Sequence, residues 1–159
     1  MNDMSLIETP IGILEIHTVK DYLCKVQFMS ETNQNRKIIS RRMSLIEKQV
    51  SLELNEYFDG KRRSFTIPLK IDVPPFYKKV LLQVQKIEYG RTSSYAEIAK
   101  MSGNEKALRA VGTANSRNPI AIIIPCHRII SSKGTLGGYT GGLDKKSFLL
   151  RHEKTNISQ

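Results

Sequence analysis

A run of five apolar residues, 120–124, is bounded by a proline on each side and leads directly into Cys126, His127 and Arg128. A short β-branched run of this kind is typical of a buried, strand-like segment. We therefore expect the segment to carry Cys126 to the edge of a hydrophobic core. The imidazole and guanidinium that follow offer a base for the thiol proton and a positive field for the thiolate. A buried structural cysteine beside a surface histidine fits the same residues equally well.

The positive charge of the chain is concentrated in the half that contains Cys126. Residues 1–72 have 11 Lys/Arg and 10 Asp/Glu, whereas residues 73–159 have 14 and 5, which accounts for nearly all of the formal charge of +10. An excess of this size favours a polyanionic partner, with nucleic acid the first candidate. A generally basic surface is the alternative.

Several classes of protein and site are disfavoured by the sequence. Cys24 and Cys126 are the two cysteines among 159 residues, so a disulfide scaffold is not expected. We expect both thiols to be reduced in a cytoplasmic protein. No stretch is long enough to span a membrane, and no signal-peptide pattern is present. The histidines are far apart and no Cys or His pair has zinc spacing, so we expect no metal. The glycine-rich stretch 134–142 fits neither a P-loop nor a dinucleotide fingerprint, and a turned loop beside a pocket fits better.

The first half of the chain is predicted to be an α/β unit. An antiparallel meander is expected over residues 4–29, and its third strand alternates in a way that predicts Cys24 in the core beside Val26 and Phe28. Apolar residues at steps of three and four predict an amphipathic helix over residues 41–58.

A basic, extended linker over residues 61–73 ends at two prolines. We place the domain boundary there, giving an N-terminal α/β domain over 1–73 and a C-terminal domain over 74–159.

The second half is predicted to be mainly helical. A first helix is expected to end at Gly90, and a capping box at Ser94 starts a second that stops near Gly103. A third is expected from 105 to 116 with Asn104 as its cap, so that the second and third form a helix-turn-helix pattern. Asp144 is expected to cap a last helix that ends near Glu153.

The third predicted helix has one polar side and one apolar side. Arg109, Gly112, Thr113 and Ser116 are expected to face outward, opposite a side that includes Leu108, Val111 and Asn115. Small residues let a helix backbone approach a groove, and an arginine can insert where a base had been. Packing of a short helix pair in a core is the alternative.

Residues 89–153 closely resemble the methylated-DNA–protein-cysteine methyltransferases, the O6-alkylguanine-DNA alkyltransferase family. The most specific motif is Pro125-Cys126-His127-Arg128 with Asn118-Pro119 before it. Further matching segments are Tyr89-Gly90, Ser94-Tyr95 through Ala99, Arg109-Ala110-Val111-Gly112, Gly138-Tyr139, Gly141-Gly142-Leu143 and His152-Glu153. The first 75 residues match more loosely, chiefly at 57–60 and 65–69.

The resemblance implies an α/β (α+β) fold, with a ribonuclease-H-like antiparallel sheet and helix followed by a helical, winged-helix-like DNA-binding domain. It implies direct reversal of DNA damage by a monomer that needs no cofactor. The alkyl group of O6-alkylguanine in double-stranded DNA, and also that of O4-alkylthymine, would pass irreversibly to Cys126 in a single turnover.

The resemblance also assigns roles to individual residues. Cys126 would be the nucleophile and alkyl acceptor, His127 its base through water, and Glu153 the group that orients His127. Asn118 would position the turn around Cys126, and Tyr95 would contact the leaving guanine and a phosphate. Arg109 would be the finger that fills the gap left by a flipped base. Further DNA contacts would come from Ala110, Gly112, Thr113, Ser94 and Arg128, and the guanine pocket would be lined by Ile129, Leu136, Tyr139 and Thr140.

The chain departs from the family at a few positions. Glu88 stands where many members have proline, and Leu81 where many have tryptophan; both changes concern packing more than chemistry. Some members bind zinc in the N-terminal domain through Cys and His, but this chain has only Cys24 and His17 there.

Two other functions are alternatives, a DNA-binding damage sensor without transfer activity and a thiol hydrolase. Damage sensors in the family lack the reactive cysteine, and peptidase signatures around Cys126 are absent.

Overall fold

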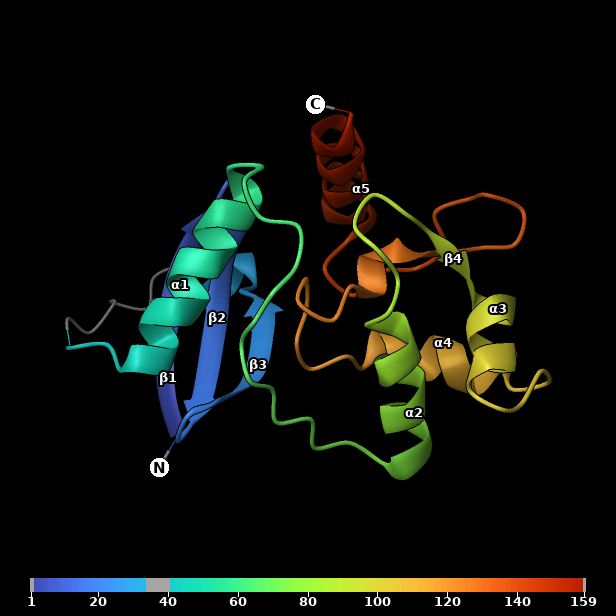
Figure 1. Cartoon of the computed structure of the whole chain (residues 1–159), viewed down its shortest axis with the longest axis horizontal. Coiled ribbons are helices and arrows are strands. Elements are labelled where there is room, and N and C mark those ends of the chain that lie inside the picture. The colour runs from blue at the N-terminus through green and yellow to red at the C-terminus, as the bar shows by residue number, and fades with distance from the viewer. Residues whose placement is uncertain (1, 34–40, 159) are drawn as a thin grey trace. The chain divides into compact units, whose positions relative to one another are not determined.

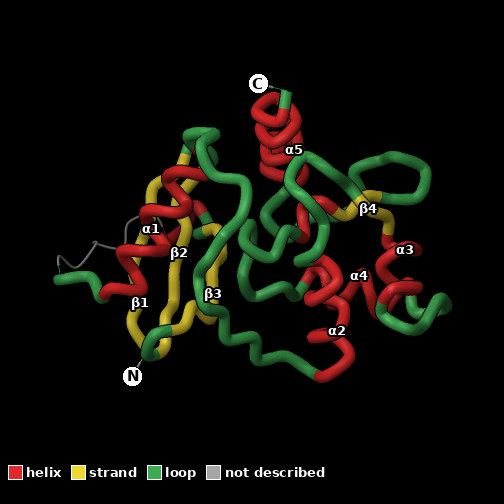
Figure 2. The backbone as a smooth tube through the Cα atoms, in the orientation of Figure 1, coloured by secondary structure: helices red, strands yellow, loops and turns green. Residues whose placement is uncertain are grey.

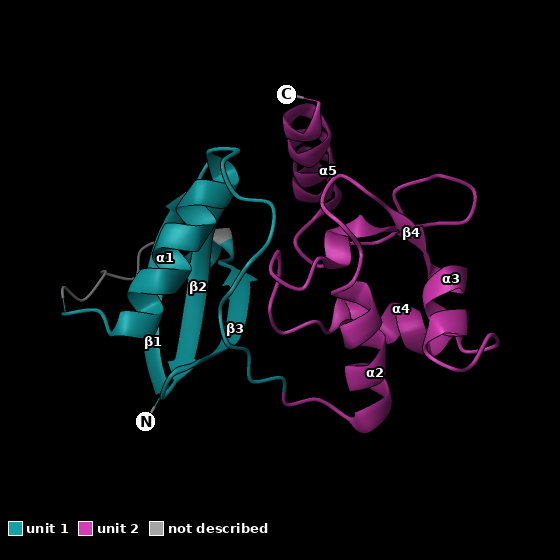
Figure 3. Ribbon diagram, in the orientation of Figure 1, with its two compact units in different colours: residues 1–71 teal, residues 72–159 magenta. Residues whose placement is uncertain are grey.

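The computed structural model describes residues 2–33 and 41–158 (Figure 1). The chain divides into two compact units, Met1–Ile71 and Asp72–Gln159 (Figure 3). Within the described residues, no helix combines the length and apolar character needed to cross a bilayer.

The first unit is a three-stranded antiparallel sheet with one helix packed on it. The strands β1 (Asn2–Thr9), β2 (Gly12–Val19) and β3 (Tyr22–Phe28) are joined by tight turns and lie in the order β1-β2-β3, as the predicted meander requires. A short 3-10 turn, η1 (Glu31–Asn33), follows the sheet. Helix α1 (Leu45–Phe58) contacts all three strands (Figure 2). Its apolar stripe is buried, as predicted, through Ile46, Val50, Leu54 and Tyr57.

The expectation that Cys24 lies in the core with Val26 and Phe28 is wrong. The register shifts along β3, so that Leu23 pairs with Thr18 and Lys25 pairs with His17 while Cys24 has no partner residue of its own. A bulge of this kind breaks the alternation of faces. Leu23 and Val26 therefore become the buried pair, whereas Cys24 is half-buried and its thiol donates to the His17 carbonyl at 3.3 Å.

Helix α1 begins later than the apolar pattern suggested. Its N-cap is Ser44, not a residue near Arg41, and a capping box fixes the start. The Glu47 amide donates to Ser44 Oγ at 3.3 Å, and Glu47 Oε2 accepts from the Ser44 amide at 2.8 Å. Beyond the helix, the extended segment runs back beside β3, where Leu23 exchanges backbone hydrogen bonds with Pro68 and Lys70 at 2.9 Å.

The second unit is built from helices and one very short parallel sheet. Its elements in chain order are α2 (Pro75–Val84), β4 (Ser93–Ser94), α3 (Tyr95–Met101), α4 (Leu108–Ser116), the 3-10 turn η2 (Cys126–Arg128), β5 (Ile129–Ile130) and α5 (Leu143–Ile157). Helices α2, α3 and α4 contact one another, and β4 pairs with β5 in parallel. The pairing places the start of α3 beside the segment that follows Cys126.

Of the two predicted caps in the helix pair α3 and α4, one starts its helix and the other does not. The predicted capping box at Ser94 is confirmed, with the Glu97 amide donating to Ser94 Oγ at 3.1 Å. Helix α4 starts at Leu108 and not at 105, because Asn104 instead caps an isolated turn by accepting from the Lys106 amide at 3.1 Å.

Four further predictions of boundaries, caps and burial are wrong. Helix α2 ends at Val84 and not near Gly90. Leu108 is exposed, and Ala114 takes the buried position on α4. Helix α5 follows Gly142 without a side-chain cap from Asp144, and it continues one turn past Glu153.

Candidate active site

The segment before Cys126 is buried, as expected, but it is not a strand. Residues 121–123 form a turn, in which the Ile123 amide donates to the Ala121 carbonyl at 2.8 Å, and the Ile124 amide donates to the Ile120 carbonyl at 3.0 Å. Ile122 has a φ of 72°, a left-handed conformation that β-branched residues rarely adopt. The β-branched composition reflects burial here, and the local hydrogen bonds decide the backbone shape.

Asn118 holds both ends of this turn through its side chain. Its amide Nδ2 donates to the Ile124 carbonyl at 2.8 Å, and its Oδ1 accepts from the Ile120 amide at 3.0 Å. The Cys126 amide then donates to the same Ile124 carbonyl at 2.8 Å. The position of the Cys126 backbone is therefore tied to the Asn118 side chain.

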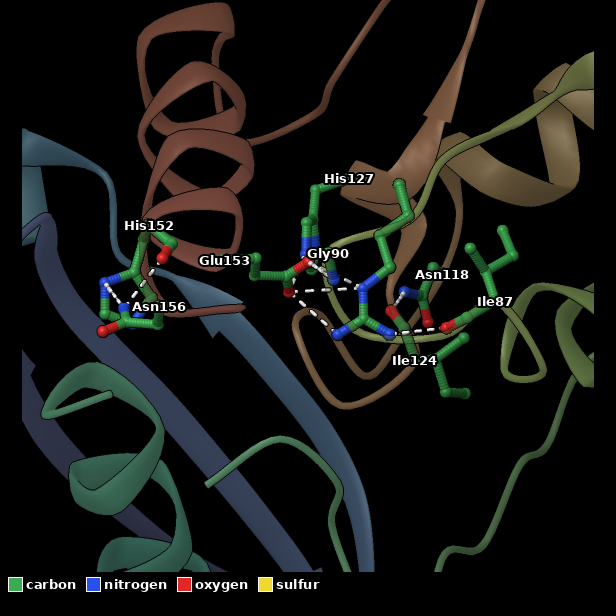
Figure 4. A network of polar contacts seen from close by, with 9 residues as sticks. Ile87, Gly90, Asn118, Ile124, His127, His152, Glu153 and Asn156 are labelled. Carbon is green, nitrogen blue, oxygen red and sulfur yellow. Dashed lines mark hydrogen bonds and ion pairs between the residues drawn. The ribbon is translucent and has the colours of Figure 1, made fainter. Parts of the chain in front are cut away.

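The 3-10 turn at η2 brings two successive side chains to one carboxylate. Figure 4 shows Glu153 of α5 beside His127. The guanidinium of Arg128 binds the same carboxylate. His127 Nε2 lies 2.7 Å from Glu153 Oε1, while Arg128 Nε and Nη2 donate to the two carboxylate oxygens at 2.9 and 2.8 Å. The Gly90 amide donates to Oε2 at 3.3 Å. Neighbouring side chains on an extended strand would point apart, so this convergence depends on the turn.

All three residues of this network are buried, which fixes their charge states. Burial alone would raise the pKa of Glu153, but hydrogen bonds and charges from His127 and Arg128 outweigh burial and lower that pKa to about 2. Burial lowers the pKa of His127, against the opposing effect of Glu153. At neutral pH the site therefore holds an ionised carboxylate beside a neutral imidazole.

The ionised carboxylate also selects the tautomer of His127. A carboxylate only accepts hydrogen bonds, so Nε2 must carry the proton and Nδ1 must present a lone pair. Nδ1 is buried and makes no hydrogen bond to any of the described residues. The Cys126 thiol, for its part, has a pKa raised by burial and lowered in opposition by the Asn118 side chain and Lys146. The arrangement is a protonated thiol followed in the chain by a neutral imidazole with a lone pair on Nδ1, which can accept a proton.

Two tyrosines stand close to the thiol. Burial raises the pKa of Tyr139 far above the usual range, and the nearby Cys126 raises it further. Burial also raises the pKa of Tyr95, whose hydroxyl lies near the Gly138 backbone and the Asn115 side chain. Gly137 lies against the Tyr95 ring so closely that an added Cβ would be 3.0 Å from its hydroxyl oxygen.

The remaining residues expected to line a pocket lie on both sides of the glycine-rich loop. Ile129 is fully buried in β5, directly after the turn that carries Cys126. Leu136 is half-buried within the loop. Thr140 is exposed, and its hydroxyl donates to the Ser116 carbonyl at 2.7 Å, which links the loop to the end of α4.

The residues expected to contact DNA are not all on the surface. Arg109 is exposed on α4, where Ala110, Gly112 and Thr113 are half-buried, and Ser94 is half-buried at the start of α3. Open space surrounds the position where a Gly112 Cβ would lie. The expectation for Arg128 is wrong, because this residue is only 5% exposed. Besides its bonds to Glu153, its Nη1 donates to the Ile87 carbonyl at 2.6 Å.

Asn115 is a site residue that the sequence interpretation placed on the inner side of α4 without a role. It is buried, and its Nδ2 donates to the Cys126 carbonyl at 3.2 Å. Asn115 lies four residues after the buried Val111, and this spacing could have indicated that Asn115 faces the core as well.

Lys146 is a second site residue that the sequence interpretation missed. Its side chain is fully buried, and Nζ donates to the Ile129 carbonyl at 2.5 Å and to the Gly138 carbonyl at 3.1 Å. Burial lowers its pKa to about 8, against the opposing effect of Cys126. The spacing of Lys146, Leu149 and Glu153 along one helix face would have indicated a lysine at a core position. Over the described residues, no group of three or more His, Cys, Asp or Glu side chains is placed to hold a metal ion.

Comparison with known proteins places both halves of the chain in one family. Residues 75–155 match the family model for the 6-O-methylguanine DNA methyltransferase DNA binding domain, and residues 4–71 match that for its ribonuclease-like domain. The methylated-DNA–protein-cysteine methyltransferase of Methanosarcina acetivorans is 43% identical over 154 residues, which cover 94% of this chain and 96% of that protein. The constitutive enzyme of that name from Bacillus subtilis is 38% identical over 168 residues, covering 100% and 99%.

A solved structure supports the same assignment. The crystal structure of Mycobacterium tuberculosis OGT in complex with DNA has a TM-score of 0.87 at 36% identity, over 96% of this chain and 93% of that one. The predicted fold class, an antiparallel sheet with a helix followed by a helical unit, is confirmed by this likeness and by the two family models. Because both domain models and relatives over nearly the whole length agree, this chain belongs to the 6-O-methylguanine DNA methyltransferase family.

Proposed function

We propose that this protein repairs DNA by transferring the alkyl group of O6-alkylguanine directly to Cys126. The observation that carries the proposal is the buried series Cys126, His127 and Glu153, in which an ionised carboxylate fixes a neutral imidazole on the residue that follows the Cys126 thiol. A thiol activated in this way is a nucleophile. The relatives named above are methyltransferases that act from methylated DNA to a protein cysteine.

The reaction balances with groups that this chain and the substrate supply. The Cys126 proton passes through water to His127 Nδ1, whose other nitrogen is held by Glu153. The thiolate attacks the alkyl carbon, so that a sulfur–carbon bond forms while the bond between that carbon and O6 breaks. The electron pair remains on the guanine, and Tyr95 donates a hydrogen bond toward this leaving group. The guanine takes up one proton, and the proton held by His127 balances this uptake, so the imidazole becomes neutral again. No cofactor enters any step.

The same chemistry makes the protein a single-use reagent. The product is a thioether, whose carbon is a poor electrophile and whose sulfur is a poor leaving group, so water does not regenerate the thiol. Alkyl transfer to Cys126 is therefore irreversible, with one alkyl group retained per chain. O4-alkylthymine presents a similar alkyl–oxygen bond and is the second substrate that we propose.

Binding to double-stranded DNA is assigned to the second half of the chain, residues 74–159, with residues 1–73 as a separate N-terminal domain. Its excess positive charge favours phosphate contacts. Arg109 is exposed on a helix whose neighbouring outward residues, Gly112 and Thr113, are small. We propose that this helix approaches the minor groove and that Arg109 occupies the space of a flipped base. We also propose that the protein acts on DNA as a monomer in the cytoplasm.

The decisive experiment counts alkyl groups. The protein is incubated with excess duplex DNA containing O6-methylguanine, and its intact mass and modified peptide are then measured. One methyl on Cys126, with repair ending at one lesion per protein, is the expected result. Repeated turnover with unmodified Cys126 would make the protein a conventional enzyme, and DNA binding with neither modification nor repair would make it a damage sensor.

A further inference from the structure

Lys146 is a buried cation, and no carboxylate among the described residues accepts a hydrogen bond from it. Its side chain has no exposed surface, and Nζ ends on two backbone carbonyls, those of Ile129 and Gly138. Carbonyl oxygens satisfy hydrogen bonds but do not neutralise a full charge. A buried ammonium without a counter-ion is unfavourable, so a nearby negative charge would stabilise it.

The buried charges of this unit do not balance in the resting state. Within residues 72–158, the buried cations are Arg128 and Lys146, and the buried carboxylate is Glu153. Arg128 and Glu153 are paired through two short hydrogen bonds. Lys146 is therefore left as an excess positive charge, while Cys126 and His127 are neutral.

The thiolate of Cys126 is the anion that would restore the balance. Lys146 and Cys126 interact electrostatically, each favouring the charged form of the other, and Lys146 also opposes the protonation of His127. The titratable groups that share this buried region are Cys126, His127 and Arg128 of η2, Glu153 and Lys146 of α5, Tyr95 of α3 and Tyr139 of the loop. Of the two buried cations, only Lys146 lacks a carboxylate in this group.

We propose that Lys146 is the charge partner of the Cys126 thiolate and a positioning residue for its chemistry. Its ammonium stabilises the thiolate through space, and its two hydrogen bonds hold the loop at Gly138 against the strand that follows Cys126. This proposal extends the function proposed above and rests on it for its biological meaning. The state of the thiol itself can nevertheless be measured without DNA.

Transfer of an alkyl group would reverse the stabilisation. The thioether carries no charge, so Lys146 would again be a buried cation without an anion. Its proton would then be held less tightly, and the anchor between Gly138 and Ile129 would weaken. The consumed protein would differ from the fresh one in the charge of Lys146 as well as in the volume at Cys126.

The test measures how fast Cys126 reacts with iodoacetamide as a function of pH. In this reaction the thiolate displaces iodide and forms a thioether, so the rate follows the thiolate fraction. Labelled peptides separate Cys126 from Cys24, which lies in the other compact unit and serves as an internal control. The variants are Lys146→Met, which removes the charge at similar length, Lys146→Arg, which keeps it, and Lys154→Met, which removes an exposed charge from the same helix.

Loss of the charge should move the reaction to higher pH. In Lys146→Met we expect the midpoint of the Cys126 profile to rise by about one pH unit, which lowers the rate at neutral pH about tenfold. Lys146→Arg and Lys154→Met should keep the midpoint, and Cys24 should react alike in all samples. A rate reduced equally at every pH would overturn the proposal in favour of a packing role. A similar rise of the Cys126 midpoint in Lys154→Met would overturn the proposal, because the net charge of the protein would then explain the effect.

A second measurement does not depend on the folding of a Lys146 variant. The Lys146 side-chain nitrogen is titrated by NMR in the unchanged chain, in Cys126→Ser and in protein already methylated on Cys126. Removal or alkylation of the thiol should lower the pKa of Lys146, because the thiolate no longer supports its charge. Identical titration with and without the ionisable thiol would overturn the proposal. Because Cys126→Ser requires no transfer, this outcome is distinct from a failure to repair DNA.

Discussion

Replacement of Glu153 by glutamine should destabilise the second unit and change how its stability depends on pH. The carboxylate accepts hydrogen bonds from Arg128, from the Gly90 amide and from His127. The glutamine side chain would keep the shape but remove the charge, and Arg128 would remain buried without its anion. Removing one partner of a buried ion pair costs about 3–5 kcal/mol in the free energy of unfolding.

The pKa of Glu153 gives an independent magnitude. A decrease from 4.5 to about 2 corresponds to roughly 3 kcal/mol of preference for the ionised form in the folded state. Because the folded pKa lies below the unfolded one, this stabilisation is complete above pH of about 4.5 and is lost as the pH falls toward about 2. Glu153→Gln lacks this group, so the difference between the two proteins should shrink over that same interval.

Urea unfolding followed by circular dichroism at a series of pH values measures both quantities. The matched control is Glu105→Gln, which removes an exposed carboxylate from the same unit and should change stability by no more than about 0.5 kcal/mol. A loss of less than about 1 kcal/mol in Glu153→Gln would show that the buried pair is not stabilising in the way that the geometry requires. A constant difference between the two proteins down to the lowest pH would show that the Glu153 pKa is not depressed.

Three further outcomes concern DNA binding and repair. Arg109→Ala should slow repair in duplex DNA far more than reaction with the free modified base, because extrusion of a base costs a few kcal/mol that an inserted side chain partly recovers. Equal losses on the two substrates, or the same loss in the exposed control Lys106→Ala, would make Arg109 structural. Gly137→Ala should slow transfer more than it weakens DNA binding, since the new Cβ would press on Tyr95 at a backbone φ of 68° that alanine adopts poorly, and unchanged single-turnover rates would contradict this. The affinity for undamaged duplex DNA should fall steeply with salt and show little sequence preference, and a flat salt dependence would remove the nucleic-acid assignment.

Local chemistry in the sequence predicted the elements whose causes are local. The capping box from Ser94 to Glu97 starts α3 in the structure because both of its hydrogen bonds join residues three positions apart. The meander could be predicted equally well from the sequence, since tight turns separate its three short strands. The bulge at Cys24 was not, because a register shift depends on the partner strand.

The site was harder to predict where a residue's environment comes from distant parts of the chain. The Pro-Cys-His-Arg motif located the thiol, but Arg128 was expected to contact DNA. Its actual partners, Glu153 and Ile87, lie 25 and 41 positions away in the chain. Lys146 was overlooked because lysine is normally exposed, and only the fold supplies the carbonyls that accept its hydrogen bonds. The turn at 120–124 was mistaken for a strand because burial and strand formation favour the same residue types.

The position of Glu153 in the chain has a consequence for protein synthesis. Gly90, His127 and Arg128 precede it by 63, 26 and 25 positions, so all three leave the ribosome before the carboxylate that joins them. Until α5 has folded, His127 lacks the carboxylate that fixes its tautomer, so Cys126 has no oriented base. A protein that can react only once would be wasted by alkylation in an incomplete state. The order of the chain thus postpones assembly of the His127–Glu153 pair until α5 has been synthesised.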